Sequence, residues 1–166
     1  MQIAPSKIRK DFARLKPREE WSFRNSRKKE LGAYSHGYHR YPAKFIPQIV
    51  RRVIEEHTSS ENALVCDPFG GCGTTLVEAK ISGRRGIAFD INPVASLITN
   101  VKITAIRPQL LKKEREIFLK RYSVNRKYSV EHRERIKYWF DTKTLKKLDK
   151  IYSAIRMIKD ARIRNF

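Results

Sequence analysis

The sequence predicts an α/β fold built on an incomplete parallel sheet. A short apolar run at 63–66 is followed by a glycine-rich bend at 67–73 and then by an amphipathic helix over 74–82. A second short strand over 86–89 leads directly into Asp90. Strand, helix and strand in this order are the start of a right-handed parallel sheet, whose strands are normally apolar because both of their faces are buried.

Flanking helices complete the predicted order of elements. Isoleucine and valine recur at helical spacing over 45–57, where Pro47 suits a first helical turn. A further helix is expected over 93–101, with Asn92 placed to cap it. Two strands, with a third candidate near Ile103, fall short of the roughly five that a doubly wound sheet needs, so the sheet is predicted to be unfinished.

Charge divides the chain into three parts. Basic residues outnumber acidic ones by 12 to 4 over 1–45 and by 19 to 7 over 107–166, whereas 46–106 holds six of each. The excesses of +8, +12 and zero sum to the net charge of +20. A neutral centre between basic flanks favours a small-molecule pocket attached to polyanion-binding surfaces over a merely soluble basic protein.

Three regions follow from this division. We expect a basic N-terminal arm at 1–34, an α/β core at 35–106 and a basic helical region at 107–166. No apolar run approaches the roughly 20 residues that a membrane span needs, and the N-terminus lacks the apolar core of a targeting peptide. Cys66 and Cys72 match no zinc or redox spacing, so a reduced, soluble and cytoplasmic protein is expected.

The basic helical region is expected to contain helices over 109–121 and 141–158, separated by a polar irregular stretch at 122–128. Its charge excess favours phosphate contact over a solvated helix face. Trp139 and Phe140 could stack on bases, although such a cluster is more often a core or partner-contact patch.

Two histidines in the segment before the first predicted helix raise the question of a metal. His36 and His39 could form a ligand pair, but no further ligand type converges on them in the sequence. We therefore expect a structural or lid role for both and predict no metal site.

The glycine-rich bend carries the clearest chemistry. Gly71 and Gly73 lack Cβ atoms, so a ligand can lie against the backbone, and glycine also tolerates positive φ. Thr74 and Thr75 can cap the helix that follows. Asp90, at the tip of the next strand, has the position from which an acid reaches ribose hydroxyls. Together these residues predict an adenosine-binding site.

Asp67 helps to choose between nucleotide cofactors. A dinucleotide would present its pyrophosphate to the helix N-terminus, where the Asp67 carboxylate would repel it. Leu76 stands where a dinucleotide-binding pattern has its third glycine, and no Gly-Lys-Thr phosphate loop is present. S-adenosylmethionine has an amino-acid end, a sulfonium and a ribose but no phosphate, and therefore suits these residues better.

Three segments together resemble the amino-group DNA methyltransferases, which make N4-methylcytosine or N6-methyladenine. The run Asp-Pro-Phe-Gly-Gly-Cys-Gly-Thr-Thr at 67–75 looks like the cofactor loop of that family, with Cys72 in place of a common serine. Residues 36–47 resemble the segment that covers the methionine end of the cofactor, and 89–93 resembles the adenosine-binding acid segment. The resemblance spans about 35–106, in a known order that has the cofactor half first.

The resemblance implies a partial Rossmann-like, S-adenosylmethionine-dependent methyltransferase fold with basic helical extensions. It also implies a set of cofactor-binding residues in this chain. Those that would close over the methionine end are Tyr41, Pro42, Ala43, Lys44 and Phe45; the cofactor loop contributes Asp67, Pro68, Phe69, Gly71, Gly73, Thr74 and Thr75; and Asp90 would take the ribose, Ile91 would pack on the adenine, and Asn92 completes the set.

The sequence departs from the family at the catalytic loop. That loop, Ser, Asp or Asn followed by Pro-Pro and Tyr or Phe, holds the exocyclic amine of a flipped base. No Pro-Pro dipeptide occurs here, and Asn92-Pro93 has only the first half of the pattern. No catalytic residue is therefore assigned, and we expect the chain to bind cofactor without transferring methyl groups unless a second chain or a missing C-terminal segment supplies the loop.

The expected function is the cofactor-binding segment of a site-specific DNA methyltransferase of restriction–modification type, with cytosine N4 favoured over adenine N6. The expected partners are DNA and either a complementary catalytic segment or a second copy of the chain. Two alternatives stay open. One is a non-catalytic nucleic-acid-binding or assembly module derived from a methyltransferase, and the other is part of an RNA methyltransferase.

Overall fold

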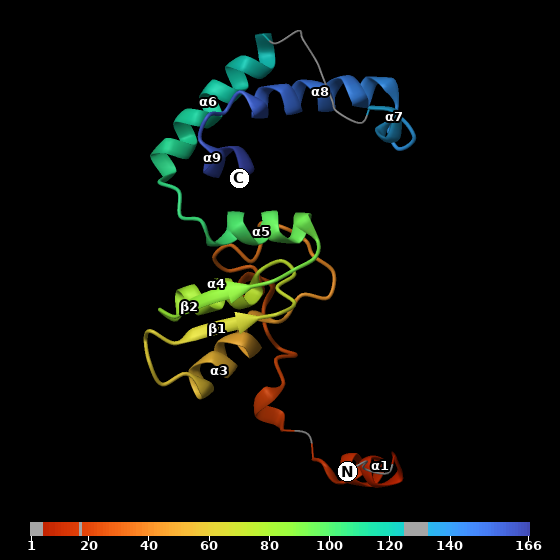
Figure 1. The fold of residues 1–166 in the computed structure, drawn as a ribbon, viewed down its shortest axis with the longest axis vertical. Helices are drawn as coiled ribbons and strands as arrows, with labels where there is room; N and C mark the ends of the chain where they lie inside the picture. The colour runs from red at the N-terminus through yellow and green to blue at the C-terminus, as the bar shows by residue number, and fades with distance from the viewer. Residues whose placement is uncertain (1–4, 17, 125–132) are drawn as a thin grey trace.

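A small α/β core lies between an N-terminal arm and a C-terminal group of helices (Figure 1). The computed structural model describes residues 5–16, 18–124 and 133–166. In chain order the elements are α1 (Pro5–Arg14), the 3₁₀ helix η1 (Glu19–Trp21), α2 (Lys28–Leu31), α3 (Pro47–His57), β1 (Leu64–Asp67), α4 (Thr74–Ile81), β2 (Arg85–Ala88), α5 (Pro93–Ile103), α6 (Pro108–Val124), α7 (Arg133–Ile136), α8 (Thr142–Arg156) and α9 (Ala161–Asn165).

The sheet of the described chain consists of β1 and β2, which pair in parallel from Leu64 opposite Arg85 to Asp67 opposite Ala88. Helix α4 makes the crossover between them, as the strand–helix–strand pattern predicts. The molecule therefore combines many helices with a small parallel sheet, which is compatible with part of a methyltransferase fold.

Helices α3 and α4 cover one face of this sheet. Val65 of β1 packs there against Val50 and Ile54 of α3 and Ala79 of α4. A Cβ atom on Gly86 of β2 would lie 3.3 Å from a side-chain carbon of α4, so glycine at this position lets the helix approach the strand closely.

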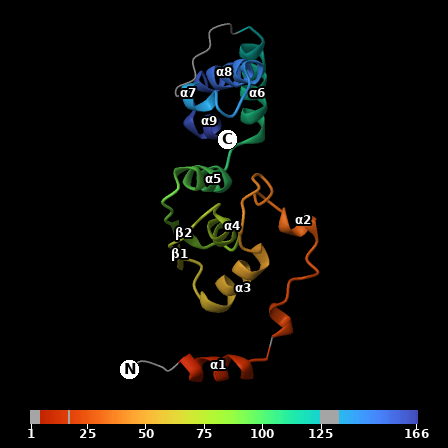
Figure 2. The same cartoon turned by 90° about the vertical axis from the view of Figure 1, so that its right-hand side faces the viewer.

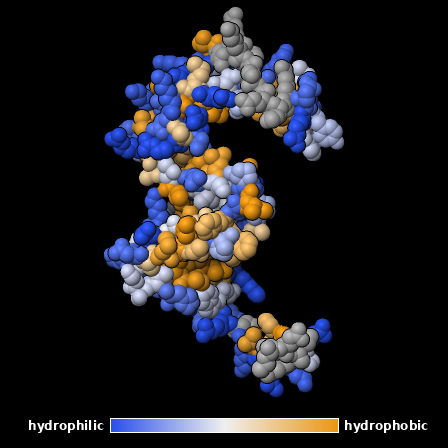
Figure 3. Space-filling view, viewed as in Figure 1, coloured by the Kyte–Doolittle hydropathy of each residue, from blue (hydrophilic) through white to orange (hydrophobic). Residues whose placement is uncertain are grey.

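In the part of the chain that the structure describes, the opposite face of the sheet is largely exposed. Leu64, Ile87 and Phe89 are between 41% and 58% exposed, and Cys66 is exposed beside them. Apolar strands are typical of a sheet that is buried on both faces, whereas in the described chain helices pack on one face, as the prediction of an unfinished sheet implies. Figure 3 shows apolar side chains gathered over this part of the molecule and hydrophilic ones over α6 and α8.

The residues predicted to end α4 and to cap α5 do so in the structure. Gly83 follows the end of α4 with a φ of 69°, and the side chain of Asn92 accepts a hydrogen bond of 2.9 Å from the amide of Val94 at the start of α5. The third strand near Ile103 is wrong, because α5 continues through that residue.

The cap of α4 also differs from expectation. Gly73, with φ 77° and ψ 26°, is the N-cap, and Thr74 and Thr75 are the first two residues of the helix. The threonines lie inside the helix because only the preceding glycine readily adopts the left-handed conformation of the bend.

The basic flanks are more helical than predicted. Helix α1 lies within the N-terminal arm, and α6 continues to Val124, so residues 122–124 of the stretch predicted to be irregular are helical. The rest of that stretch lies outside the described residues. Helix α8 begins after Asp141 as expected, but it ends at Arg156, and the short helix α9 follows as a separate element.

Candidate cofactor-binding site

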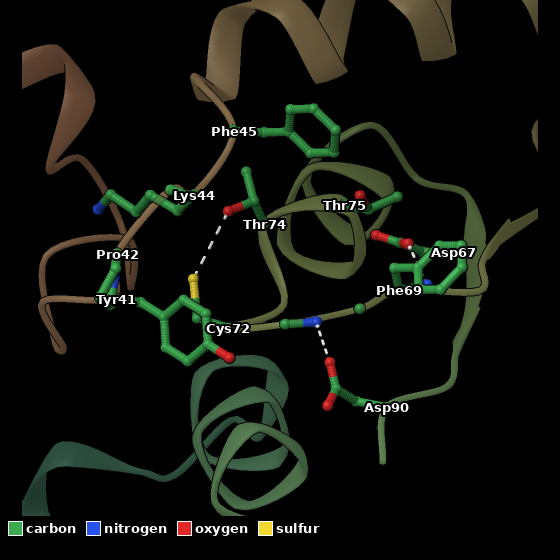
Figure 4. A pocket seen from close by; sticks show the side chains of 13 residues that line it. Tyr41, Pro42, Lys44, Phe45, Asp67, Phe69, Cys72, Thr74, Thr75 and Asp90 are labelled. Carbon is green, nitrogen blue, oxygen red and sulfur yellow. Dashed lines mark hydrogen bonds between the residues drawn. The ribbon is translucent and has the colours of Figure 1, made fainter. Parts of the chain in front are cut away.

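A cavity of about 270 Å³ lies at the carboxyl ends of the two strands, where α4 begins (Figure 4). This edge is where ligands bind in open parallel sheets. Three segments far apart in the sequence enclose it. The lining residues are Tyr41, Pro42, Ala43, Lys44, Phe45, Asp67, Phe69, Gly70, Gly71, Cys72, Thr74, Thr75 and Asp90.

The backbone of the bend needs its glycines for two separate reasons. Gly71 and Gly73 have φ values of 50° and 77°, which residues with a Cβ rarely adopt. A Cβ on Gly73 would also lie 2.7 Å from the hydroxyl oxygen of Thr99, and one on Gly70 would lie 2.8 Å from the Cβ of Ala88. The bend is therefore pressed against both α5 and the end of β2.

Asp90 ties this bend to the end of β2. Its Oδ2 accepts a hydrogen bond of 2.8 Å from the amide of Gly71, and its Oδ1 accepts one of 2.8 Å from the amide of Asn92 (Figure 4 shows the first). Since each carboxylate oxygen can accept more than one hydrogen bond, the carboxylate retains capacity for a ligand hydroxyl.

Asp67 and the 41–45 segment lie on different sides of the bend (Figure 4). The Oδ1 of Asp67 accepts a hydrogen bond of 3.0 Å from the amide of Phe69, which makes a local turn of the Asx type. Across the bend, the Nζ of Lys44 donates to the carbonyl of His36 at 3.1 Å. The cavity thus has two carboxylates, while its one lining ammonium has a partner in the protein.

A second cavity, of about 420 Å³, adjoins the first and shares Phe69 and Asp90 with it. Its lining is more apolar, and Ile91 contributes a fully exposed side chain. The lining residues are Pro68, Phe69, Ala88, Phe89, Asp90, Ile91 and Ser96. A ligand with a polar end and a flat apolar end could occupy both cavities with its middle beside Asp90.

A buried ionic cluster holds the segment before the cavity in place. The ring of His36 lies 2.7 Å from Oε1 of Glu78 on α4, and the Nε of Arg51 on α3 donates to Oε2 of Glu78 at 2.8 Å. His36 and Glu78 are fully buried. The cluster joins three segments, and through the Lys44–His36 hydrogen bond it reaches the 41–45 segment itself.

Both charged partners of this cluster have perturbed pKa values. Burial alone would raise the pKa of Glu78, but hydrogen bonds from His36 and Arg51 outweigh it and hold that pKa below its ordinary value. The hydrogen bond to Glu78 in turn raises the pKa of Arg51. Glu78 is therefore an ionised carboxylate at neutral pH despite being inaccessible to solvent.

The structure brings most of the predicted site residues together. Eleven line the first cavity, and Pro68 and Ile91 line the second. Gly73 and Asn92 line neither, because one is the N-cap of α4 and the other caps α5. The first cavity also includes Gly70 and Cys72, which the motif contained but which were not singled out as ligand-binding.

Other kinds of site are not found in the described part of the chain. No three His, Cys, Asp or Glu side chains there are grouped so that they could hold a metal ion. Among the same residues, no helix has the length and apolar character needed to cross a membrane.

Comparison with known sequences gives one family model and several relatives named as type II methyltransferases. A family model described as DNA methylase, for N6 and N4 methyltransferases, matches residues 5–100, which is more than half of the chain. The type II methyltransferase M.MvaI of Kocuria varians is 32% identical over 155 residues, covering 87% of this chain and 34% of that protein. The type II methyltransferase M.MjaII of Methanocaldococcus jannaschii is 41% identical over 85 residues, covering 51% and 16%.

A third relative, the type II methyltransferase M.BsoBI of Geobacillus stearothermophilus, is 37% identical over 62 residues, which is 37% of this chain and 12% of that protein. The chain thus spans about a third or less of the length of these relatives. No solved structure matches it significantly. Because the family match extends over the bend, both strands and most of α5, the chain belongs to the N6/N4 DNA methylase family, whose members use S-adenosylmethionine as the methyl donor.

Proposed function

We propose that this chain is the cofactor-binding segment of a site-specific DNA methyltransferase of restriction–modification type, acting on an exocyclic base amine, with cytosine N4 favoured over adenine N6. The observation that carries the proposal is the first cavity. It gathers the 41–45 segment, the bend and Asp90 around one space, and these are the residues that the family resemblance assigns to the cofactor.

The chemistry of the lining supports S-adenosylmethionine over a phosphate-bearing nucleotide. Asp67 and Asp90 would meet the ammonium group and the ribose hydroxyls, whereas a pyrophosphate would face both negative charges. Ile91 and Phe69, in the more apolar second cavity, suit an adenine ring. When bound, the cofactor supplies an electrophilic methyl group on its sulfonium, and the 41–45 segment would shield that end from water.

Contact with DNA is proposed for the basic flanks. The +12 excess over residues 107–166 suits the phosphate backbone, whose neutralisation dominates nucleic-acid affinity. We propose that the catalytic loop lies on polypeptide outside these 166 residues, because no Pro-Pro motif occurs among them. The chain alone would then bind S-adenosylmethionine and DNA but leave DNA unmethylated.

Replacing Asp67 tests the cofactor site. Asp67→Asn removes the charge but leaves an oxygen that can still accept from the amide of Phe69, so the bend is preserved. We expect the affinity for S-adenosylmethionine, measured by calorimetry, to fall by about 1–3 kcal/mol, which is the effect of losing a charged hydrogen-bond partner. The control is Glu61→Gln, which neutralises an exposed carboxylate in the connector before β1 and should leave the affinity unchanged.

Four outcomes would contradict parts of the proposal. Equal affinity in Asp67→Asn and the unsubstituted chain would remove Asp67 from the site. A folded chain that binds no S-adenosylmethionine would favour a non-catalytic nucleic-acid-binding module. Methylation of duplex DNA by the chain alone would refute the need for a separate catalytic segment, and preference for structured RNA over duplex DNA would favour an RNA substrate.

A further inference from the structure

Three consecutive aromatic residues between α7 and α8 project into solvent. Tyr138, Trp139 and Phe140 are 82%, 75% and 45% exposed, and we refer to them as the aromatic tip. The rings of Tyr138 and Trp139 contact each other edge to face, with centroids 5.0 Å apart. This exposure excludes the core role for the cluster and leaves contact with a partner or with bases.

Backbone hydrogen bonds fix the conformation of the aromatic tip on the surface of the protein. The amides of Trp139 and Phe140 both donate to the carbonyl of Ile136, at 3.0 and 3.2 Å, so the chain turns tightly after α7. Immediately afterwards Asp141 caps α8 by accepting a hydrogen bond of 2.7 Å from the amide of Thr144. A turn fixed at both ends presents large apolar rings with little loss of conformational entropy on binding.

Basic residues flank the aromatic tip on both sides in the sequence. Residues 134–147 contain five basic and two acidic side chains, and both acids are already engaged: Glu134 with Lys137, and Asp141 with the start of α8. The remaining basic residues are all exposed, and they are Arg135, Lys143, Lys146 and Lys147. An apolar protein surface would have to desolvate these charges, whereas a nucleic acid offers phosphates for the cations and flat bases for the rings.

We infer that the aromatic tip stacks on unpaired bases of single-stranded or locally opened DNA, while the neighbouring lysines contact its phosphates. The inference rests on the proposed function only in taking DNA as the polyanion. Bases in an intact duplex are already stacked on each other, so only opened or single-stranded DNA offers free base faces. The tip and the carboxyl ends of β1 and β2 lie on the same side of the molecule (Figures 1 and 2), so one DNA molecule could contact both regions.

The chain contains two tryptophans, Trp21 and Trp139, which allows a direct optical test. In Trp21→Phe all tryptophan fluorescence comes from the aromatic tip. We expect an oligothymidylate strand to quench this fluorescence strongly, and the same strand annealed into a duplex to quench it weakly although it binds. The matched control is Trp139→Phe, which leaves only Trp21, stacked under Arg52 at 4.5 Å, and should show little change.

Affinity measurements separate stacking from charge. Trp139→Ala is expected to weaken single-strand binding by about 5- to 150-fold, the range measured for removing one base–aromatic stack, with the salt slope unchanged. Trp139→Phe should recover most of this loss because the ring is retained. Lys146→Ala and Lys147→Ala, in contrast, should weaken single-strand and duplex binding alike and lower the salt slope by about 0.7 for each lost contact.

The result that overturns the inference is a Trp139 signal that does not respond to bound single strands, or an unchanged single-strand affinity in Trp139→Ala. In Trp21→Phe, a Trp139 emission maximum that shifts with protein concentration in the absence of DNA would also overturn it, in favour of contact between copies of the chain through the tip. Loss of S-adenosylmethionine binding with normal quenching would instead count against the proposed function alone.

Discussion

At the scale of single residues, the bend depends most on Gly73. Alanine there would have to adopt a φ of 77° and would place its Cβ 2.7 Å from the hydroxyl of Thr99. The strained backbone costs about 1–2 kcal/mol and overpacking about 1–3 kcal/mol, so we expect Gly73→Ala to lower the free energy of unfolding by about 2–5 kcal/mol. Urea titration followed by circular dichroism measures this difference.

A second glycine separates the two causes. Gly83 has a similar φ of 69°, but a Cβ on it would meet no atom within 4 Å. Gly83→Ala should therefore cost only the backbone strain of about 1–2 kcal/mol. Equal destabilisation by the two substitutions would mean that α5 yields at Thr99, and that the close packing against the bend contributes little.

At the scale of elements, Glu78 connects α4 with α3 and with the segment that leads to the cavity. Glu78→Gln keeps the shape of the side chain but leaves Arg51 and His36 without their anion. Breaking a buried pair usually costs about 3–5 kcal/mol, and because Arg51 is 38% exposed we expect about 2–3 kcal/mol. Glu61→Gln, an exposed change in the connector before β1, is the control for urea unfolding and should have little effect.

The same cluster predicts how stability varies with pH. The pKa of Glu78 is lower in the folded chain than its ordinary value of 4.5, so the unfolded chain binds more protons as the pH falls. The stabilisation by Glu78 is complete above about pH 4.5 and is lost as the pH falls through the lowered pKa. Unfolding free energies of the unsubstituted chain and Glu78→Gln should therefore converge below pH 4.5, and parallel curves would contradict the assignment.

These elements also mark what the sequence can predict. The positions of glycine and proline and the spacing of apolar residues are local signals. They predicted the ends of β1, α4, β2 and α5 to within one or two residues. The role of Glu78 could not be found in this way, because its partners His36 and Arg51 lie 42 and 27 positions away. The family motif identified the cavity lining, but it contains no sign of the ionic cluster behind it.

At the scale of the whole molecule, the charge of the sequence predicts the division into core and flanking regions better than its apolar content predicts which face of the sheet is buried. The neutral residues 46–106 include α3, β1, α4, β2 and α5, and the described residues of the basic C-terminal region form α6 to α9, which lie together at one end of the molecule (Figure 2). The uncovered face of the sheet was only partly foreseeable: two strands implied an unfinished sheet, but the apolar content of each strand pointed to burial. Apolar residues on both faces of a strand are typical of a sheet that is covered on both sides. In the described chain, helices cover β1 and β2 on one face only.

That uncovered face predicts self-association of the isolated chain. Leu64, Ile87 and Phe89 are about half exposed, so each would gain about 1 kcal/mol if a second copy buried it fully, whereas the net charge of +20 opposes contact between copies. We therefore expect a concentration-dependent increase in sedimentation coefficient that strengthens with added salt, because salt screens the repulsion. Leu64→Glu should suppress this association even though it lowers the net positive charge. Leu15→Glu makes the same charge change on an exposed leucine outside the core and should not suppress the association. Equal effects of the two substitutions would show that the face is not an association surface. A chain that stays monomeric at high salt would show the same.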